Sequence, residues 1–178
     1  MRCFIAVDIE PQLKHSVEKL QAELRGLDNK LVETENLHFT MKFLGEVNEA
    51  TVNKVKTILK GVVSRHKPFS VTLKGVGVFP SEKFVRVVWV GGEELTSMQE
   101  DINARLAALF KKEKPSPHLT IARVRSQKYL SKIVDFIKVH KNEEIGTMHI
   151  SELKLKKSVL TREGAVYEDV AVFKLVNK

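Results

Sequence analysis

Two short segments of the chain repeat one pattern, a histidine followed two residues later by a threonine. They are His38-Phe39-Thr40-Met41 and His118-Leu119-Thr120-Ile121. Residues two apart in a β-strand share one face, so each segment would present an imidazole and a hydroxyl on one side and apolar side chains on the other. We therefore predict that the two strands lie side by side and that the four polar side chains meet in one cleft.

Other kinds of site find less support in the sequence. Either histidine alone is most simply an ordinary strand histidine on a solvated face, whereas two copies with matched threonines favour a shared site. The remaining histidines stand singly, and no His-Glu-x-x-His segment supplies the ligands of a zinc site. There is no GxxxxGKS or GxxxxGKT loop and no GxSxG elbow. Gly75-Val76-Gly77 lacks the rest of a dinucleotide fingerprint and is expected to mark a bend or a bulge.

Two histidines without a metal are suited to paired acid–base chemistry. Imidazole titrates near neutral pH, so one ring can accept a proton while the other, protonated, donates one. Phosphoryl transfer at a nucleotide needs this division of labour, and threonine hydroxyls can donate hydrogen bonds to the non-bridging oxygens. The net charge of +8 favours a polyanionic partner, nucleic acid first, although a lysine-rich surface explains it equally well.

Four amphipathic helices and a set of strands are expected to position these residues. The spacing of apolar residues predicts helices over 10–26, about 49–65, about 93–112 and about 130–137. Strands are predicted over 2–8, 31–33, 37–44, 69–79, 84–90, 118–124, 145–157 and 166–176. Each half would hold strands, two helices and one histidine–threonine strand, which indicates an ancient duplication. With 178 residues and no low-complexity linker, two lobes packed around a shared cleft are expected.

The compartment and the oligomeric state are predicted from weaker signals. Cys3 is the only cysteine, which excludes a disulfide framework within the chain and favours the cytoplasm. The N-terminal MRCFIAVDIE is too short and too soon acidic for a signal peptide, and no apolar run approaches membrane-spanning length. No exposed heptad or large apolar surface is evident, so a monomer without membrane contact is expected.

Several segments in a fixed order carry a resemblance to a known family. They are HFTMKFLGEV (38–47), GVGVFP (75–80), RVVWVG (86–91), SPHLTIARV (116–124) and LKLKKSVLTREGAVYE (153–168). With them the chain resembles the 2H phosphoesterase superfamily, and most of all its 2′-5′ RNA ligase / RNA 2′,3′-cyclic phosphodiesterase family, over essentially its whole length. The resemblance implies an α+β fold in which 1–178 form a single bilobal domain. Two antiparallel sheets, related by a pseudo-two-fold axis, would flank a central groove, with the helices on the outside.

The resemblance also implies a reaction. It is the hydrolysis of RNA 2′,3′-cyclic phosphate ends to 2′-phosphates, without a metal and without a cofactor. Two alternatives stay open: 2′-5′ ligation of such an end to a 5′-hydroxyl RNA end, for example between tRNA halves, and a non-catalytic nucleotide- or RNA-binding module. Carried over to this chain, His38 and His118 become the acid–base pair, with His118 favoured as the base, and Thr40 and Thr120 become the phosphate donors.

Further residues are predicted to border the substrate. Phe43 and Arg123 each lie five residues beyond a histidine, and the resemblance suggests that both stack on the terminal base. Simple alternation puts them on the opposite face from their histidines, so this prediction requires a bulge or a strand end, and core packing explains Phe43 equally well. Lys42 shares the histidine face by alternation and is predicted to meet a phosphate, with a solvated lysine as the equal alternative. Ser158 and Tyr167 are expected to shape the groove.

Overall fold

The computed structural model describes residues 1–177, whose strands form one antiparallel sheet. The strands are β1 (Arg2–Asp8), β2 (Asn29–Leu31), β3 (His38–Glu46), β4 (Phe69–Ser81), β5 (Phe84–Gly91), β6 (His118–Val124), β7 (Glu144–Ile150), β8 (Glu152–Thr161) and β9 (Gly164–Lys174). Their order across the sheet is β7-β4-β5-β6-β3-β1-β8-β9, with β2 beside β6. The helices are α1 (Pro11–Ala22), α2 (Glu49–Val63), α3 (Thr96–Arg105) and α4 (Leu130–His140).

The sheet consists of two four-stranded arms that meet at one residue pair. The arm β7-β4-β5-β6 joins the arm β3-β1-β8-β9 where Phe39 of β3 pairs with Leu119 of β6. Only Ser151 separates β7, at one edge of the sheet, from β8, next to the other edge, so the sheet curls back on itself. The predicted α+β class is confirmed. The two sheets of the prediction are continuous in the part of the chain that the structure describes.

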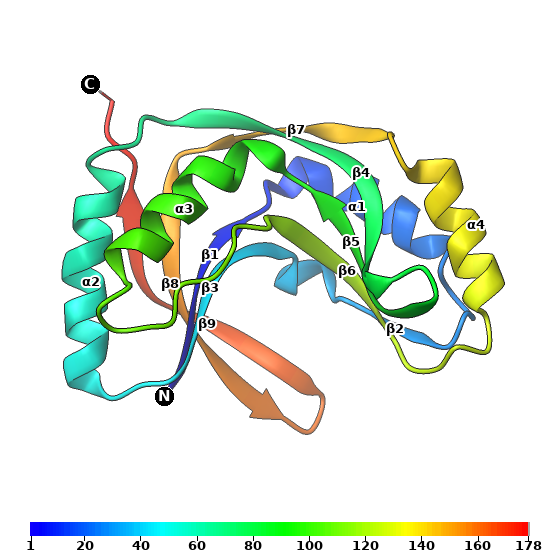
Figure 1. The fold of residues 1–178 in the computed structure, drawn as a ribbon, viewed down its shortest axis with the longest axis horizontal. Coiled ribbons are helices and arrows are strands. Elements are labelled where there is room, and N and C mark those ends of the chain that lie inside the picture. Colours follow the sequence, from blue (N-terminus) through cyan, green and yellow to red (C-terminus); the bar gives the residue numbers. More distant parts are fainter. Residues whose placement is uncertain (178) are drawn as a thin grey trace.

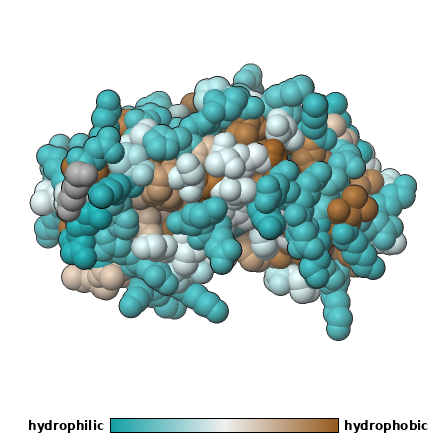
Figure 2. All heavy atoms as spheres, turned by 90° about the horizontal axis from the view of Figure 1, so that it is seen from above, coloured by the Kyte–Doolittle hydropathy of each residue, from teal (hydrophilic) through white to brown (hydrophobic). Residues whose placement is uncertain are grey.

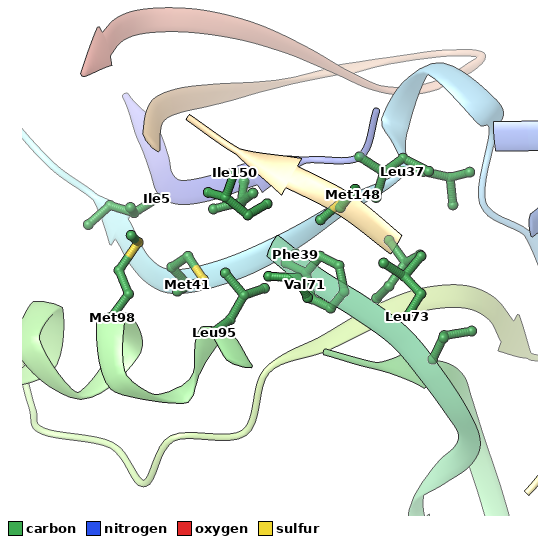
Figure 3. Packing of buried hydrophobic residues seen from close by; sticks show 14 of the residues in the cluster. Ile5, Leu37, Phe39, Met41, Val71, Leu73, Leu95, Met98, Met148 and Ile150 are labelled. Atoms are coloured by element: carbon green, nitrogen blue, oxygen red, sulfur yellow. The ribbon is translucent and has the colours of Figure 1, made fainter. Parts of the chain in front are cut away.

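The core lies against the faces of β3 and β6 that carry the apolar motif residues. α2 and α4 stand at opposite ends of the molecule (Figure 1). In Figure 3, Leu95 and Met98 of the segment leading into and through α3 pack beside Phe39 and Met41 of β3. Phe39 is fully buried, and burying a side chain of this size contributes roughly 2 kcal/mol. The apolar half of the first motif is therefore part of the core, which leaves the polar half facing the other way.

Several predicted boundaries differ from the observed ones. The predicted strand 145–157 is two strands, because the chain leaves β4 after Ile150 and pairs with β1 from β8 onward. The phase of the apolar alternation shifts by one residue between Ile150 and Leu153, which is the sequence signal for this change of partner. The predicted helix 93–112 is a 3-10 turn followed by α3, which ends at Arg105. The expected irregularity at Gly75 is confirmed, since β4 shifts register there and Gly75 has φ +79°.

The β8–β9 hairpin projects from the sheet on the side away from α3 (Figure 1). It is fastened next to the turn that joins its two strands, where Asn36 Nδ2 donates a hydrogen bond to the backbone oxygen of Ala165 at 3.1 Å. Hydrophilic side chains predominate on the face seen from above, with hydrophobic ones reaching the surface in patches between them (Figure 2). Within residues 1–177, no helix is long and apolar enough to cross a membrane.

Candidate active site

A groove of about 610 Å³ lies on the face of β3 and β6 opposite to the core. It is lined by the four polar side chains of the two motifs, His38, Thr40, His118 and Thr120. Because β3 and β6 run antiparallel through the pair Phe39–Leu119, His38 lies across from Thr120, and Thr40 lies across from His118. The structure therefore brings the four predicted side chains together, two from each half of the chain.

Both histidines are oriented by the same backbone contact. His38 Nδ1 lies 2.6 Å from the backbone oxygen of Asn36, and His118 Nδ1 lies 2.7 Å from that of Ser116. A carbonyl oxygen only accepts, so in each ring Nδ1 carries the hydrogen and donates it. This fixes the neutral tautomer in which Nε2 is free to accept a proton. His38 Nε2 lies 2.9 Å from Thr40 Oγ1, inside the groove.

The pKa values of the two imidazoles are shifted in the same direction by burial, but the charges near the two rings differ. Burial lowers the pKa of both His38 and His118 below the ordinary histidine value, and the positive charge of Arg123 acts in the same direction on both. The charge of Asp8 raises the pKa of His38 against these effects, while Lys156 lowers it. His38 is therefore the ring with a carboxylate nearby to stabilise its protonated form.

Aromatic rings hold each imidazole from the side. The ring of Tyr167 stands edge-on to His38 at a centroid distance of 5.3 Å, and the ring of Phe79 stands edge-on to His118 at 4.8 Å. Trp89 packs beside Phe79, and it needs the space left by Gly77, because a Cβ on Gly77 would overlap the Trp89 ring. These contacts restrict the rotation of both histidines, and Tyr167 takes the groove-shaping place predicted for it.

A β-bulge in each motif strand turns Phe43 and Arg123 into the groove. Met41 is an extra residue in β3 relative to β1, and Ile121 is the equivalent extra residue in β6 relative to β5. Each bulge shifts the alternation of side chains by one residue. Phe43 is consequently 64% exposed and lines the groove, as does Arg123. The predicted placement of Phe43 and Arg123 beside the substrate required a bulge or a strand end, and the structure has a bulge in each strand.

The prediction that Lys42 shares the histidine face is wrong. The bulge at Met41 turns Lys42 into the core, where it is 2% exposed. Its Nζ donates to Asn103 Oδ1 and to the backbone oxygen of Lys111, both at 2.8 Å, and lies 3.4 Å from the carboxylate of Glu113. Lys42 therefore ties β3 to α3 and to the loop before β6, and it does not reach the groove.

A cluster of four charged side chains adjoins His38. Lys154 Nζ lies 2.9 Å from Asp8 and 3.1 Å from Asp169, and Lys156 Nζ lies 3.2 Å and 2.8 Å from the same two carboxylates. Burial alone would raise the pKa of Asp169, but the hydrogen bonds from Lys156 and Lys154 lower it. Asp8 pairs directly with His38 across β1 and β3. The cluster fastens β1, β8 and β9 together beside one of the two histidines.

Several residues at the groove were not predicted from the sequence. Arg2, Lys30 and Phe79 line the groove, and Asn36 and Ser116 orient the histidines. The last two act through backbone oxygens that any residue would supply, so their side chains carry no signal. Among residues 1–177, no three His, Cys, Asp or Glu side chains are grouped so that they could hold a metal ion.

Paired histidines and threonines on two symmetry-related strands, facing one groove, define a two-histidine phosphoesterase. The model of the family described as LigT-like phosphoesterase matches residues 7–89. A Methanothermobacter thermautotrophicus protein named RNA 2′,3′-cyclic phosphodiesterase is 36% identical over 98% of this chain and 99% of its own length. A Methanocaldococcus jannaschii protein of the same name is 40% identical over 94% of this chain and 97% of its own. The chain belongs to the LigT-like phosphoesterase family, as its resemblance implied.

Solved structures agree with this fold. The crystal structure of TT0787 from Thermus thermophilus has a TM-score of 0.82 and 25% identity, and 98% of each chain is covered. Escherichia coli LigT in complex with 3′-AMP has a TM-score of 0.78 and 21% identity, covering 99% of this chain and 98% of that one. The second likeness is of the fold alone.

Proposed function

We propose that this chain hydrolyses RNA 2′,3′-cyclic phosphate ends to 2′-phosphates, with residues 1–178 acting as one bilobal domain. The observation that carries this proposal is the matched orientation of the two histidines. Each Nδ1 donates to a backbone oxygen, which leaves Nε2 of each ring for proton transfer, with His38 Nε2 lying 2.9 Å from the Thr40 hydroxyl in the same groove. The relatives that share nearly the whole chain bear the name of this activity.

The reaction needs one proton taken and one proton given. In the proposed mechanism His118 Nε2 removes a proton from water, whose oxygen attacks phosphorus in line with the P–O3′ bond. As that bond breaks, protonated His38 gives its proton to O3′, and the phosphate stays on O2′. His118 ends the turnover protonated and His38 neutral, and exchange with solvent restores the starting state. In this scheme a histidine makes each proton transfer at the reacting oxygens.

The assignment of acid and base rests on the surroundings of the two rings. Asp8 favours the protonated form of His38 while Lys156 and Arg123 oppose it, whereas the charge acting on His118 is that of Arg123 alone, which opposes protonation. A group that must be protonated before the reaction is best placed beside a carboxylate. We therefore propose His38 as the acid and His118 as the base.

The remaining groove residues are proposed to hold the substrate. The hydroxyls of Thr40 and Thr120 would donate hydrogen bonds to the non-bridging oxygens, where charge grows in the transition state. Phe43 and Arg123 would stack on bases, since an exposed ring and a guanidinium both offer a flat face. The groove also carries Lys30, a further positive charge suited to an RNA backbone.

The pH dependence of kcat/KM is expected to have its maximum on the acid side, below about pH 6.5. This ratio reports the free enzyme, in which burial lowers the pKa of both histidines. Raising the pH above both pKa values leaves both rings neutral, so the acid is lost and kcat/KM falls. The bound phosphate anion raises both pKa values, so kcat should peak at higher pH than kcat/KM. Initial rates measured from about pH 4 to about pH 9 would check this. A maximum of kcat/KM above neutral pH would contradict it.

The direct test of the function is turnover of a nucleoside 2′,3′-cyclic phosphate and of an RNA oligonucleotide with the same end, each in excess EDTA. Undiminished hydrolysis in EDTA is expected. Activity that disappears with EDTA and returns with a divalent cation would overturn the two-histidine mechanism. Tight binding of the nucleotide without turnover would instead favour the binding-module alternative.

A second candidate is 2′-5′ ligation, because the groove extends to both sides of the central residue pair. β3 and β6 run in opposite directions from Phe39–Leu119, so Phe43 and Arg123 lie toward different ends of the groove. One end would hold the cyclic phosphate nucleotide while the other admits a 5′-hydroxyl RNA end, with tRNA halves as a candidate pair and a monomer as the acting form. Rates of hydrolysis and ligation measured on the same RNA ends at equal concentration would decide between the two.

A further inference from the structure

The two bulges place Phe43 and Arg123 in the groove. Each bulge is an irregularity in the strand that other contacts must stabilise. A bulge residue is left out of the regular ladder, so its backbone oxygen needs another hydrogen-bond donor. Both bulge residues, Met41 and Ile121, are fully enclosed by the core. Water therefore does not supply that donor. The backbone N–H of Val32 donates to the oxygen of Ile121 at 3.0 Å, and buried side chains supply further donors.

A buried glutamine donates to the backbone oxygen of each bulge residue. Gln99 Nε2 of α3 lies 3.1 Å from the oxygen of Met41, and Gln21 Nε2 of α1 lies 2.9 Å from the oxygen of Ile121. Gln99 is 8% exposed and Gln21 is 4% exposed. In both cases the glutamine comes from the other half of the chain than the bulge it holds. Each half of the chain thus supplies the glutamine that bonds the bulge of the other half, just as each half supplies two of the four polar side chains of the groove.

Each glutamine makes a second bond to the segment that precedes a motif strand. Gln99 Oε1 accepts a hydrogen bond from the backbone N–H of Ser116 at 3.0 Å, next to the oxygen that orients His118. Gln21 Nε2 also donates to the backbone oxygen of Val32 at 2.9 Å. Each amide therefore has two backbone partners, and its orientation is fixed by both of them.

We propose that Gln99 and Gln21 are positioning residues that set the two substrate-contacting side chains, Gln99 acting on Phe43 and Gln21 acting on Arg123. The consequence for substrate binding rests on the proposed function. Without Gln99 the buried oxygen of Met41 loses its side-chain donor, and without Gln21 the oxygen of Ile121 keeps only the backbone N–H of Val32. The bulge is then less stable relative to a regular strand. The side chain at position 43 or 123 is consequently no longer held in the groove.

The kinetic test uses Gln99→Met and Gln21→Met, which keep the side-chain length and remove the amide. Gln99→Met is expected to raise KM about tenfold, the effect of losing one stacking contact, and Gln21→Met to raise it less, because the N–H of Val32 still donates to Ile121. Gln99→Met also removes the bond to Ser116, so its kcat should fall as well, whereas the kcat of Gln21→Met should change little. In the Phe43→Ala background, Gln99→Met should cause no further rise in KM, because its effect passes through Phe43. Gln21→Met should show the same dependence on Arg123→Ala. An equal rise in KM with and without Phe43 would overturn the proposal.

Gln127→Met is the matched control. Gln127 also makes two backbone hydrogen bonds, both to Val85, at 3.0 Å and 2.7 Å, and it is not among the groove residues. This variant should lower the melting temperature and leave KM unchanged. A rise in KM equal to that of Gln99→Met would mean that loss of any such bond disturbs the groove, and the proposal would fail.

A second measurement does not depend on catalysis. Backbone amide NMR shifts should change at 41–43 and at Ser116 in Gln99→Met, and at 121–123 in Gln21→Met. Residues 121–123 should be unchanged in the first variant, and residues 41–43 in the second. This readout stays interpretable even if the chain shows no phosphodiesterase activity. Shift changes spread equally over both strands would contradict the assignment. If a methionine variant does not fold, Gln→Asn at the same position, one methylene too short to reach the oxygen, gives the same test.

Discussion

Replacing either groove histidine by alanine is expected to lower kcat by about 10²–10⁴-fold, the usual contribution of a positioned acid or base. His38 and His118 both line the groove, and no other histidine of the described chain does. The double variant should be little worse than either single one, because an acid and a base acting in one step work as a unit. Single-turnover rates for the two single variants and the double variant would check this.

The control for these variants is His15→Ala, since His15 is exposed on α1 and lies outside the groove. A substrate with sulfur in place of O3′ separates the two roles, because a thiolate leaves without protonation more readily than an alkoxide. His38→Ala should recover much of its lost rate on this substrate, and His118→Ala should not. Recovery by His118→Ala alone would reverse the assignment of acid and base, and full activity of either variant on RNA would rule out the pair.

The second large effect is expected from Thr40→Val and Thr120→Val, each lowering kcat by about 10²-fold. Valine keeps the shape of threonine and removes the hydroxyl that would donate to a non-bridging oxygen. Charge on these oxygens is greatest in the transition state, so kcat should fall far more than KM rises. Steady-state kinetics of both variants would measure this split.

Threonine-to-serine variants at the same positions are the matched controls, because serine keeps the hydroxyl. Both are expected to retain activity within a few-fold of the unmodified protein, by the same reasoning. Thr40 also lies 2.9 Å from His38 Nε2, so Thr40→Val should shift the pH profile, while Thr120→Val should not. A valine variant with unchanged kcat would show that its hydroxyl does not contact the reacting phosphate.

The polar half of the site was predictable from local spacing. A histidine and a threonine two residues apart on a strand share a face whatever the rest of the chain does, and the duplicated pattern indicated that the two strands meet. The structure confirms the α+β class and brings His38 and His118 into one groove. The pairing of Phe39 with Leu119 supplies the contact between the halves that the pattern could only suggest.

The bulges could not be predicted from the same spacing, because they depend on tertiary contacts. Met41 and Ile121 are ordinary apolar residues, and their displacement is stabilised by glutamines distant in sequence. Simple alternation therefore placed Lys42 on the wrong face of β3. Lys42 is buried and donates a hydrogen bond to Asn103. The backbone oxygens that orient the histidines were equally hidden, since a backbone acceptor requires no particular side chain.

The central claim is that one histidine protonates O3′ while the other activates water, which leaves the phosphate on O2′. The most direct measurement is ³¹P NMR of the product formed from an RNA 2′,3′-cyclic phosphate in ¹⁸O-labelled water with EDTA present. We predict a 2′-phosphate as the product, carrying one ¹⁸O atom from the attacking water. A 3′-phosphate would contradict the assigned leaving oxygen, and an unlabelled phosphate would contradict attack by water.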